Sequence, residues 1–211
     1  MARVEIGDVP TLLRKMENYD GTLVTRLALK LMALTFVRTS ELIEGGWSEI
    51  SWRKKEWVIP KERMKQVRGA VGMKPHYVPL SDQALDVLQS LYEITGYGEL
   101  MFPHQWDKTK TMSKNTILEA LYRMGYKCEI TGHGFRGVAA TVLHEKWKIA
   151  DPLKEQYIDL QLAHIRRNNV KAAYDHSKHM EQRTVMMQWW ADYLDQARKQ
   201  RTLPHPKHVA R

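Results

Sequence analysis

The sequence predicts a mainly helical α+β fold, in which helices surround one small three-stranded antiparallel sheet. In most of the 211 residues apolar side chains recur at helical spacing, as in Leu23, Leu27, Leu31 and Leu34. Only residues 47–79 instead hold short runs rich in Trp, Tyr, Val and Ile. A chain of this length can bury one substantial core, so we expect one domain with a tail.

Helix boundaries follow from capping residues and helix breakers. Asp8 and Pro10 open the first predicted helix, which ends before Asp20, and the second runs from Thr22 to about Phe36. Ser40 is predicted to cap a short helical turn that ends at Gly45-Gly46, Ser81 to cap a helix, and residues 95–110 to form a loop. Ser113 is predicted to cap a helix that stops at Gly125, and further helices are predicted from Gly134 to about Trp147 and from Asp151-Pro152 onward. The last two predicted elements are a short helix over 170–174 and an amphipathic helix over 180–194.

The predicted sheet comprises strands over residues 47–51, 56–59 and 76–79. A basic, glycine-containing loop over 61–74 separates the second strand from the third. The domain is expected to cover residues 1–197, and the basic, proline-broken tail 198–211 is expected to be disordered.

Composition narrows the class of protein. The formal net charge of +9 favours a polyanionic partner such as nucleic acid, although many basic proteins bind none. Cys128 is the only cysteine, which excludes a disulfide framework and a cysteine-based zinc site and fits the cytoplasm. The most apolar stretch, 27–37, is short and contains Lys30, so no membrane span is expected.

Five polar residues lie in local sequences that point to one active site: Arg38, His133, Arg136, His164 and Tyr174. Guanidinium groups bind phosphate oxygens in pairs, and a hydroxyl nucleophile needs the charge of its target neutralised first. His133 and Arg136 are three residues apart at a predicted helix start, so both side chains can face one anion.

Each of these residues also has a structural interpretation. Arg38 could pair with Glu41 on the surface, where Glu41 would otherwise orient its guanidinium toward a phosphate. His133 and Arg136 could be ordinary solvated side chains, His164 a buried structural residue, and Tyr174 a packing residue.

Taken in order, these motifs resemble the catalytic domain of the tyrosine recombinases, most closely prophage and genomic-island integrases of the satellite-phage type. The resemblance extends from about Leu23 to Leu194 and includes TFVRTSEL, HYVPLS, HGFRGVAATVLHE, QLAH and MMQWWADYL. It implies site-specific cleavage and rejoining of double-stranded DNA, without metal or cofactor, by a protein that is monomeric alone and tetrameric on its attachment sites.

The resemblance also implies a role for each residue. Tyr174 would attack a phosphodiester, forming a 3′-phosphotyrosyl bond and releasing a 5′-hydroxyl. Arg38 and Arg136 would bind the non-bridging oxygens, His133 would handle the tyrosine proton, and His164 would donate a hydrogen bond to the phosphate. A free tyrosine has a pKa of about 10, so attack at neutral pH requires a base or a positive field.

A lysine in the loop between the second and third strands would protonate the leaving oxygen. Lys65 matches the family's position relative to the second strand, but the loop is longer than in the family, and Lys74 remains an alternative.

Three further expectations concern the whole protein. The family's core-binding and arm-binding domains, which precede the catalytic domain, are absent from this sequence. Two other functions remain open, namely DNA relaxation of the type IB topoisomerase kind and DNA binding without catalysis. The sequence also leaves open whether the Tyr174 segment and the last helix dock on their own subunit or on a neighbour.

Overall fold

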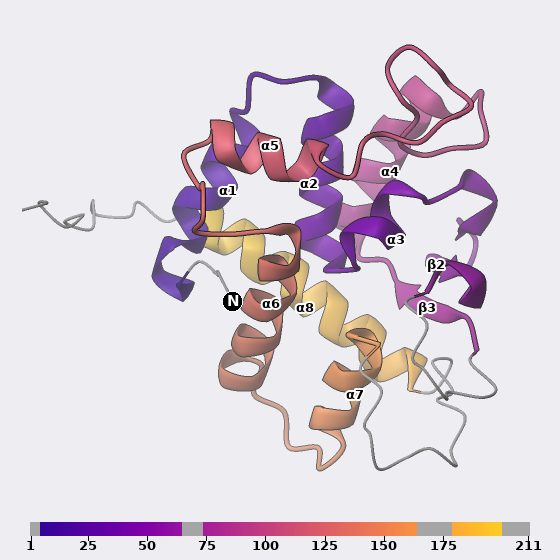
Figure 1. The fold of residues 1–211 in the computed structure, drawn as a ribbon. Coiled ribbons are helices and arrows are strands. Elements are labelled where there is room, and N and C mark those ends of the chain that lie inside the picture. Colours follow the sequence, from indigo (N-terminus) through magenta and orange to yellow (C-terminus); the bar gives the residue numbers. More distant parts are fainter. Residues whose placement is uncertain (1–4, 65–73, 164–178, 200–211) are drawn as a thin grey trace, which may run out of the picture.

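The computed structural model describes residues 5–64, 74–163 and 179–199 (Figure 1). The helices are α1 (Val9–Glu17), α2 (Leu23–Thr35), α3 (Thr39–Ile43), α4 (Asp82–Thr95), α5 (Thr116–Arg123), α6 (Gly132–Lys146), α7 (Lys154–Gln161) and α8 (Met180–Lys199), with 3-10 turns at Ile6–Asp8, Trp47–Glu49 and Lys61–Arg63. The strands are β1 (Ile50–Ser51), β2 (Glu56–Ile59) and β3 (His76–Pro79), in one antiparallel sheet. The predicted fold class is confirmed.

Helix α2 is the central element of the core. It contacts α1, α4, α5, α6 and α8, and its middle residues such as Leu29 and Leu31 are fully buried. It begins one residue after the predicted Thr22, which caps its first turn: Oγ1 of Thr22 accepts a hydrogen bond from the N–H of Thr25 at 3.2 Å. The helix is capped at its C-terminus by Phe36, whose left-handed backbone (φ 40°) turns the chain out of the helix two residues before Arg38.

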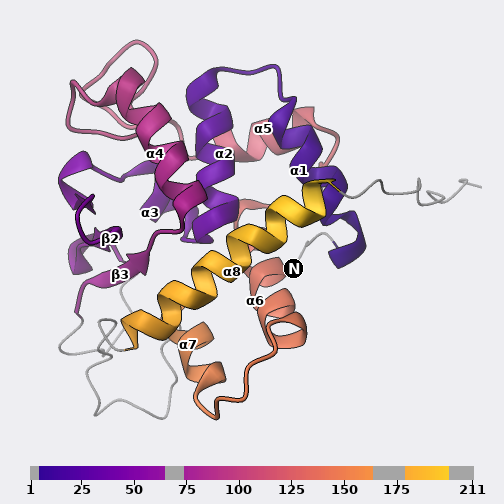
Figure 2. The same ribbon diagram turned by 180° about the vertical axis from the view of Figure 1, so that it is seen from behind.

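Helix α8 crosses the back of the molecule from α7 and β3 to α1 (Figure 2). Its apolar face is buried in its own chain, where the indole N–H of Trp190 donates to the carbonyl of Ala33 at 2.9 Å. In this structure of a single chain, the last helix thus packs on its own core. It is longer than the predicted 180–194, since Arg198 lies within it and pairs with Glu17 at 2.5 Å.

Although α8 has 20 residues, neither it nor another helix in the described ranges is long and apolar enough to span a membrane.

The sheet forms where predicted, except at its first strand. Ile50 pairs with Trp57, and Trp57 pairs with Val78 on its other side. Residues Trp47–Glu49 were predicted as strand but form a 3-10 turn. The indole of Trp47 donates to the carbonyl of Thr95 at the end of α4, and this contact holds the chain away from the line of the sheet.

Several predicted helix starts are shifted. Ser81 caps α4 as predicted, with Oγ accepting from Ala84 at 3.3 Å. Ser40 lies inside α3, whose first turn is capped by the Glu41 side chain, and α5 begins at Thr116, three residues after Ser113. Helix α6 begins at Gly132 and not at Gly134, because the N–H of Gly134 already donates to the carbonyl of Thr131. This last shift places His133 inside the helix.

Candidate active site

Arg38 lies at the corner where α2 leads into α3. Its backbone N–H donates to Oε2 of Glu41 at 2.9 Å, and its Nη1 donates to Oε1 at 2.6 Å. The Glu41 carboxylate is fully buried, whereas 23% of the Arg38 side chain is exposed. One carboxylate therefore caps α3 and orients the guanidinium. The alternative of a surface ion pair is wrong, because Glu41 has no exposed surface.

Arg136 lies in the second turn of α6 and is 3% exposed. Its Nη1 donates to the carbonyl of Phe36 at 2.8 Å, and its Nη2 donates to the carbonyl of Leu162. Its Nε is also buried, and no described residue accepts a hydrogen bond from it. A buried donor without an acceptor is costly, so this nitrogen favours a further oxygen ligand.

Electrostatics set the two arginines apart from an ordinary ion pair. Burial and, to a smaller extent, the charge of Arg38 lower the pKa of Arg136, the charge of Glu41 opposes them, and the resulting pKa is about 10. Arg136 is therefore still cationic at neutral pH. One carboxylate faces two guanidinium groups, which leaves an excess of positive charge that a phosphodiester would neutralise.

The two guanidinium groups meet at the turn that follows α7. Arg136 binds the carbonyl of Leu162, and Nη2 of Arg38 binds the next carbonyl, that of Ala163, at 3.2 Å. Ala163 has a left-handed backbone (φ 46°), a conformation that is strained for a residue with a Cβ atom. Three segments far apart in sequence are thus fixed at one point, the turn that follows α7.

His133 occupies the first turn of α6, three residues before Arg136, and its side chain is exposed. The position of this turn depends on Gly132. A Cβ atom there would lie 2.1 Å from Oγ1 of Thr39, so the start of α6 lies directly against the start of α3. Sequence reasoning missed Gly132, although the glycine before the HGFR motif was an available signal.

Arg63 is a second residue that sequence reasoning missed. Its Nε donates to Oε1 of Glu49 at 2.8 Å, and its Nη1 donates to the backbone carbonyl of Glu41 at 3.1 Å. Glu49 also accepts from the indole of Trp57 at 2.9 Å. The chain leading into the loop after β2 is thereby tied to α3, the helix that orients Arg38. Nothing in the local sequence indicated this pairing.

Three predicted catalytic residues, Lys65, His164 and Tyr174, lie outside the described residues, as does the predicted helix over 170–174. Lys74 is described, and it is exposed directly before β3. The choice between Lys65 and Lys74 therefore stays open. Of the predicted set, Arg38 contacts Glu41 directly, and Arg38 and Arg136 bind neighbouring carbonyls of one turn. His133 lies one turn before Arg136 on α6.

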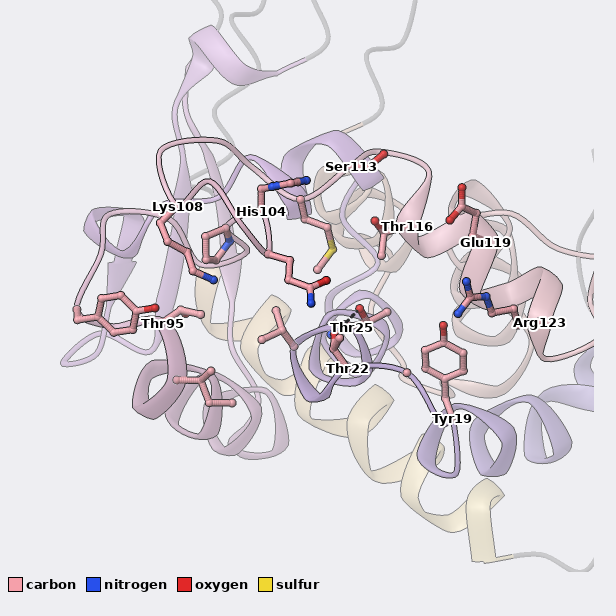
Figure 3. A pocket seen from close by; sticks show the side chains of 17 residues that line it. Tyr19, Thr22, Thr25, Thr95, His104, Lys108, Ser113, Thr116, Glu119 and Arg123 are labelled. Atoms are coloured by element: carbon pink, nitrogen blue, oxygen red, sulfur yellow. Dashed lines mark hydrogen bonds between the residues drawn. The ribbon is translucent and has the colours of Figure 1, made fainter.

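A hollow of about 390 Å³ lies elsewhere, at the opposite end of α2 (Figure 3). Tyr19, Thr22, His104 and Arg123 line it, and none of the predicted site residues does. Helix α2 rises about 1.5 Å per residue, so its length separates this hollow from Arg38 by about 20 Å. Within the described ranges, no group of three or more His, Cys, Asp or Glu side chains is placed to hold a metal ion.

Comparison with known proteins identifies one family and relatives that belong to the same class, the integrases. The model of the Phage integrase family matches residues 3–181. The integrase of Enterobacteria phage P4 is 48% identical over 198 residues, which are 90% of this chain and 44% of that protein. Prophage integrase IntA of Escherichia coli (strain K12) is 35% identical over 197 residues, 93% of this chain and 45% of that protein. The chain spans about half the length of the curated relatives it matches.

Solved structures share the fold. XerA recombinase superposes with a TM-score of 0.57 at 13% identity, over 95% of this chain and 66% of that one. The catalytic core of lambda integrase superposes with a TM-score of 0.54 at 17% identity, over 79% of this chain and 93% of that one. The arrangement of α-helices around the small sheet is thus that of tyrosine recombinase catalytic domains.

Proposed function

We propose that this chain, which belongs to the phage integrase family, is the catalytic part of a site-specific DNA recombinase. The observation that carries the proposal is the Arg38–Arg136 pair. Two guanidinium groups from distant segments bind adjacent carbonyls, only one of them is paired with a carboxylate, and the other has a buried Nε with no acceptor among the described residues. A phosphodiester bound beside the pair would supply the missing negative charge.

The proposed reaction exchanges one phosphodiester for another. The hydroxyl of Tyr174 attacks phosphorus, a 3′-phosphotyrosyl bond forms, and the 5′-oxygen of the next nucleotide leaves. Arg38 and Arg136 stabilise the charge that grows on the non-bridging oxygens in the transition state. His133 takes the tyrosine proton, and His164 donates a hydrogen bond to the phosphate.

The leaving 5′-oxygen takes a proton from Lys65, with Lys74 as the alternative donor. Rejoining is the reverse reaction with a different 5′-hydroxyl. Because the energy of the broken bond is kept in the phosphotyrosine, strand exchange consumes no nucleotide triphosphate. Integration or excision of a prophage or genomic island is the proposed biological outcome.

The proposed partner is double-stranded DNA carrying an attachment site, bound by a tetramer of the protein. Two observations on other proteins support it. Lambda integrase has been solved as a dimer bound to a COC′ core site and as a tetramer bound to a Holliday junction. The net charge of +9 adds non-specific, salt-dependent affinity for the duplex.

The test is covalent trapping on a nicked duplex that contains the attachment site and loses its 5′-hydroxyl strand after cleavage. Wild-type protein is expected to form a protein–DNA adduct, and Tyr174→Phe is expected to form none. Tyr122→Phe is the matched control, because it removes the same hydroxyl from an exposed position on α5 and should leave the adduct unchanged.

Two other outcomes would redirect the proposal. Relaxation of supercoiled DNA that lacks any attachment site, at a rate equal to cleavage of the site, would identify a topoisomerase. Binding of the site by wild-type protein without an adduct would identify a DNA-binding protein without catalysis, and the proposed function would be wrong.

A further inference from the structure

Arg183 is a buried cation at the start of α8 that joins three elements. It is 0% exposed, and its Nη2 donates both to Oε1 of Gln161 at 2.8 Å and to the backbone carbonyl of Tyr77. Its Nη1 contacts the sulfur of Met180 in its own helix at 3.6 Å. One guanidinium therefore holds α8 against the end of α7 and against β3.

The elements joined by Arg183 border the proposed catalytic residues in the sequence. Gln161 is the last residue of α7, and the next two carbonyls, those of Leu162 and Ala163, bind Arg136 and Arg38. The segment with His164 and Tyr174 thus begins directly after this turn and ends where α8 begins. Arg183 connects the two ends of that segment.

The start of α8 limits the position of Tyr174 more strongly than the end of α7 does. Tyr174 is five residues from His179, so its Cα cannot lie farther than about 18 Å from that residue, whatever path the chain takes. From Ala163 the corresponding limit is about twice as long, because Tyr174 is eleven residues from it. The placement of the tyrosine therefore depends more strongly on where α8 begins than on where α7 ends.

Stability alone does not account for a charge at this position. Burial lowers the pKa of Arg183 to about 10, opposed by the charge of Glu56. Moving a cation out of water costs several kcal/mol, and an apolar side chain of similar volume in such a place is often equally or more stabilising. What distinguishes arginine from an apolar side chain here is its set of directional hydrogen bonds to Gln161 and Tyr77.

We propose that Arg183 is a positioning residue that holds the nucleophile segment in register with the Arg38–Arg136 pair. This inference rests on the proposed function, in which Tyr174 is the nucleophile. In this scheme Arg183 acts through the segments that it joins and is not itself a catalytic group. It acts by fixing the first turn of α8 to Gln161, one residue before the turn that the two arginines bind.

The first test compares two nucleophiles at the same phosphate. Arg183→Met is expected to lower single-turnover cleavage by Tyr174 about 100-fold, the loss associated with misplacing a reacting group by about 1 Å. In a Tyr174→Phe background, hydrogen peroxide supplies a small nucleophile whose anion attacks phosphorus and displaces the same 5′-oxygen. That reaction needs the arginine pair but no positioned tyrosine, so adding Arg183→Met should change its rate less than about 3-fold.

Arg198→Met is the matched control for this test. It removes an arginine from the same helix, but one that is 36% exposed and pairs with Glu17 near the far end. Its cleavage rate should equal that of wild-type protein. Equal losses of the tyrosine and peroxide reactions in Arg183→Met would show a general folding role and overturn the proposal, as would an unchanged tyrosine reaction.

The second test does not depend on catalysis. Arg166, Arg167 and Lys171 lie between α7 and α8 in the sequence and are sites for trypsin. Arg183→Met should accelerate digestion there several-fold while leaving other sites unchanged, and Gln161→Leu should do the same, because each removes one side of the connection. Unchanged digestion in both variants would overturn the proposal. Absence of any adduct with wild-type protein would instead refute the proposed function, whatever the digestion shows.

Discussion

Arg38 and Arg136 bind neighbouring carbonyls of one turn, yet they are held in opposite ways. Arg38 is partly exposed and paired with a buried carboxylate at 2.6 Å. Arg136 is almost fully buried and binds two backbone carbonyls, with its pKa lowered to about 10 mainly by burial. The first arginine is oriented by an anion that belongs to the protein. Arg136 is desolvated and bound only to neutral acceptors, so its attraction to an incoming anion should be stronger than that of Arg38.

The largest expected effect is therefore that of Arg136→Lys. Lysine keeps the charge but cannot bind both the Phe36 and Leu162 carbonyls while presenting a further donor. Cleavage should fall by about 10³-fold, which is the upper end of the range for loss of one preorganised donor. The free energy of unfolding should fall by about 1–3 kcal/mol, because buried carbonyls lose their donors. Single-turnover trapping and urea unfolding measure the two effects.

Arg38→Lys is the matched comparison. Its lysine can still pair with Glu41, so cleavage should fall only about 10²-fold and the free energy of unfolding should change by less than about 1 kcal/mol. Equal losses in the two variants would show that burial does not distinguish the arginines, and the comparison would fail.

The next effect in size is that of Glu41→Gln, which removes the anion and keeps the shape. The amide can accept only one of the two hydrogen bonds that Arg38 donates to the carboxylate. Cleavage should fall about 10-fold to 100-fold, as for other residues that orient a charged ligand-binding group.

Glu41→Gln also tests the electrostatic coupling. The charge of Glu41 raises the pKa of Arg136, so its removal should lower that pKa below about 10. Titration of the guanidinium carbons by 13C NMR would follow the change. A pKa that stays constant or rises would mean that the carboxylate serves Arg38 alone.

The sequence predicted most of the fold because its signals are local. Apolar spacing identified α2, and Ser81 was correct as a cap because its cap bond spans only three residues. The errors arose where distant contacts decide. Trp47 was predicted in a strand from its β propensity, but its hydrogen bond to Thr95 produces a 3-10 turn.

The candidate site divides in the same way. Arg38, His133 and Arg136 were identified because family motifs surround them. The burial of Arg136 on the Phe36 and Leu162 carbonyls, the tie from Arg63 to Glu41, and the fork of Arg183 join residues 22 to 106 positions apart. Periodicity and spacing carry no information on such pairs.

The smallest expected effect concerns how the two arginines are brought together. Gly132→Ala places a methyl group 2.1 Å from Oγ1 of Thr39, so α6 must shift relative to α3. Overpacking of this kind costs about 1–3 kcal/mol of unfolding free energy. Cleavage should fall about 10-fold, less than the roughly 10²-fold loss for a 1 Å misplacement, because a smaller shift relieves the contact.

The double variant Gly132→Ala/Thr39→Ala removes the hydroxyl that the new methyl group meets. It should recover most of the stability and most of the cleavage rate, while Thr39→Ala alone should leave cleavage within about 2-fold of wild type. Thermal unfolding and single-turnover trapping of the four proteins complete the cycle. Additive losses in the double variant would mean that Gly132 is required for its backbone freedom and not for the close approach of the two helices, and the spacing between Arg38 and Arg136 would then depend on the carbonyl turn alone.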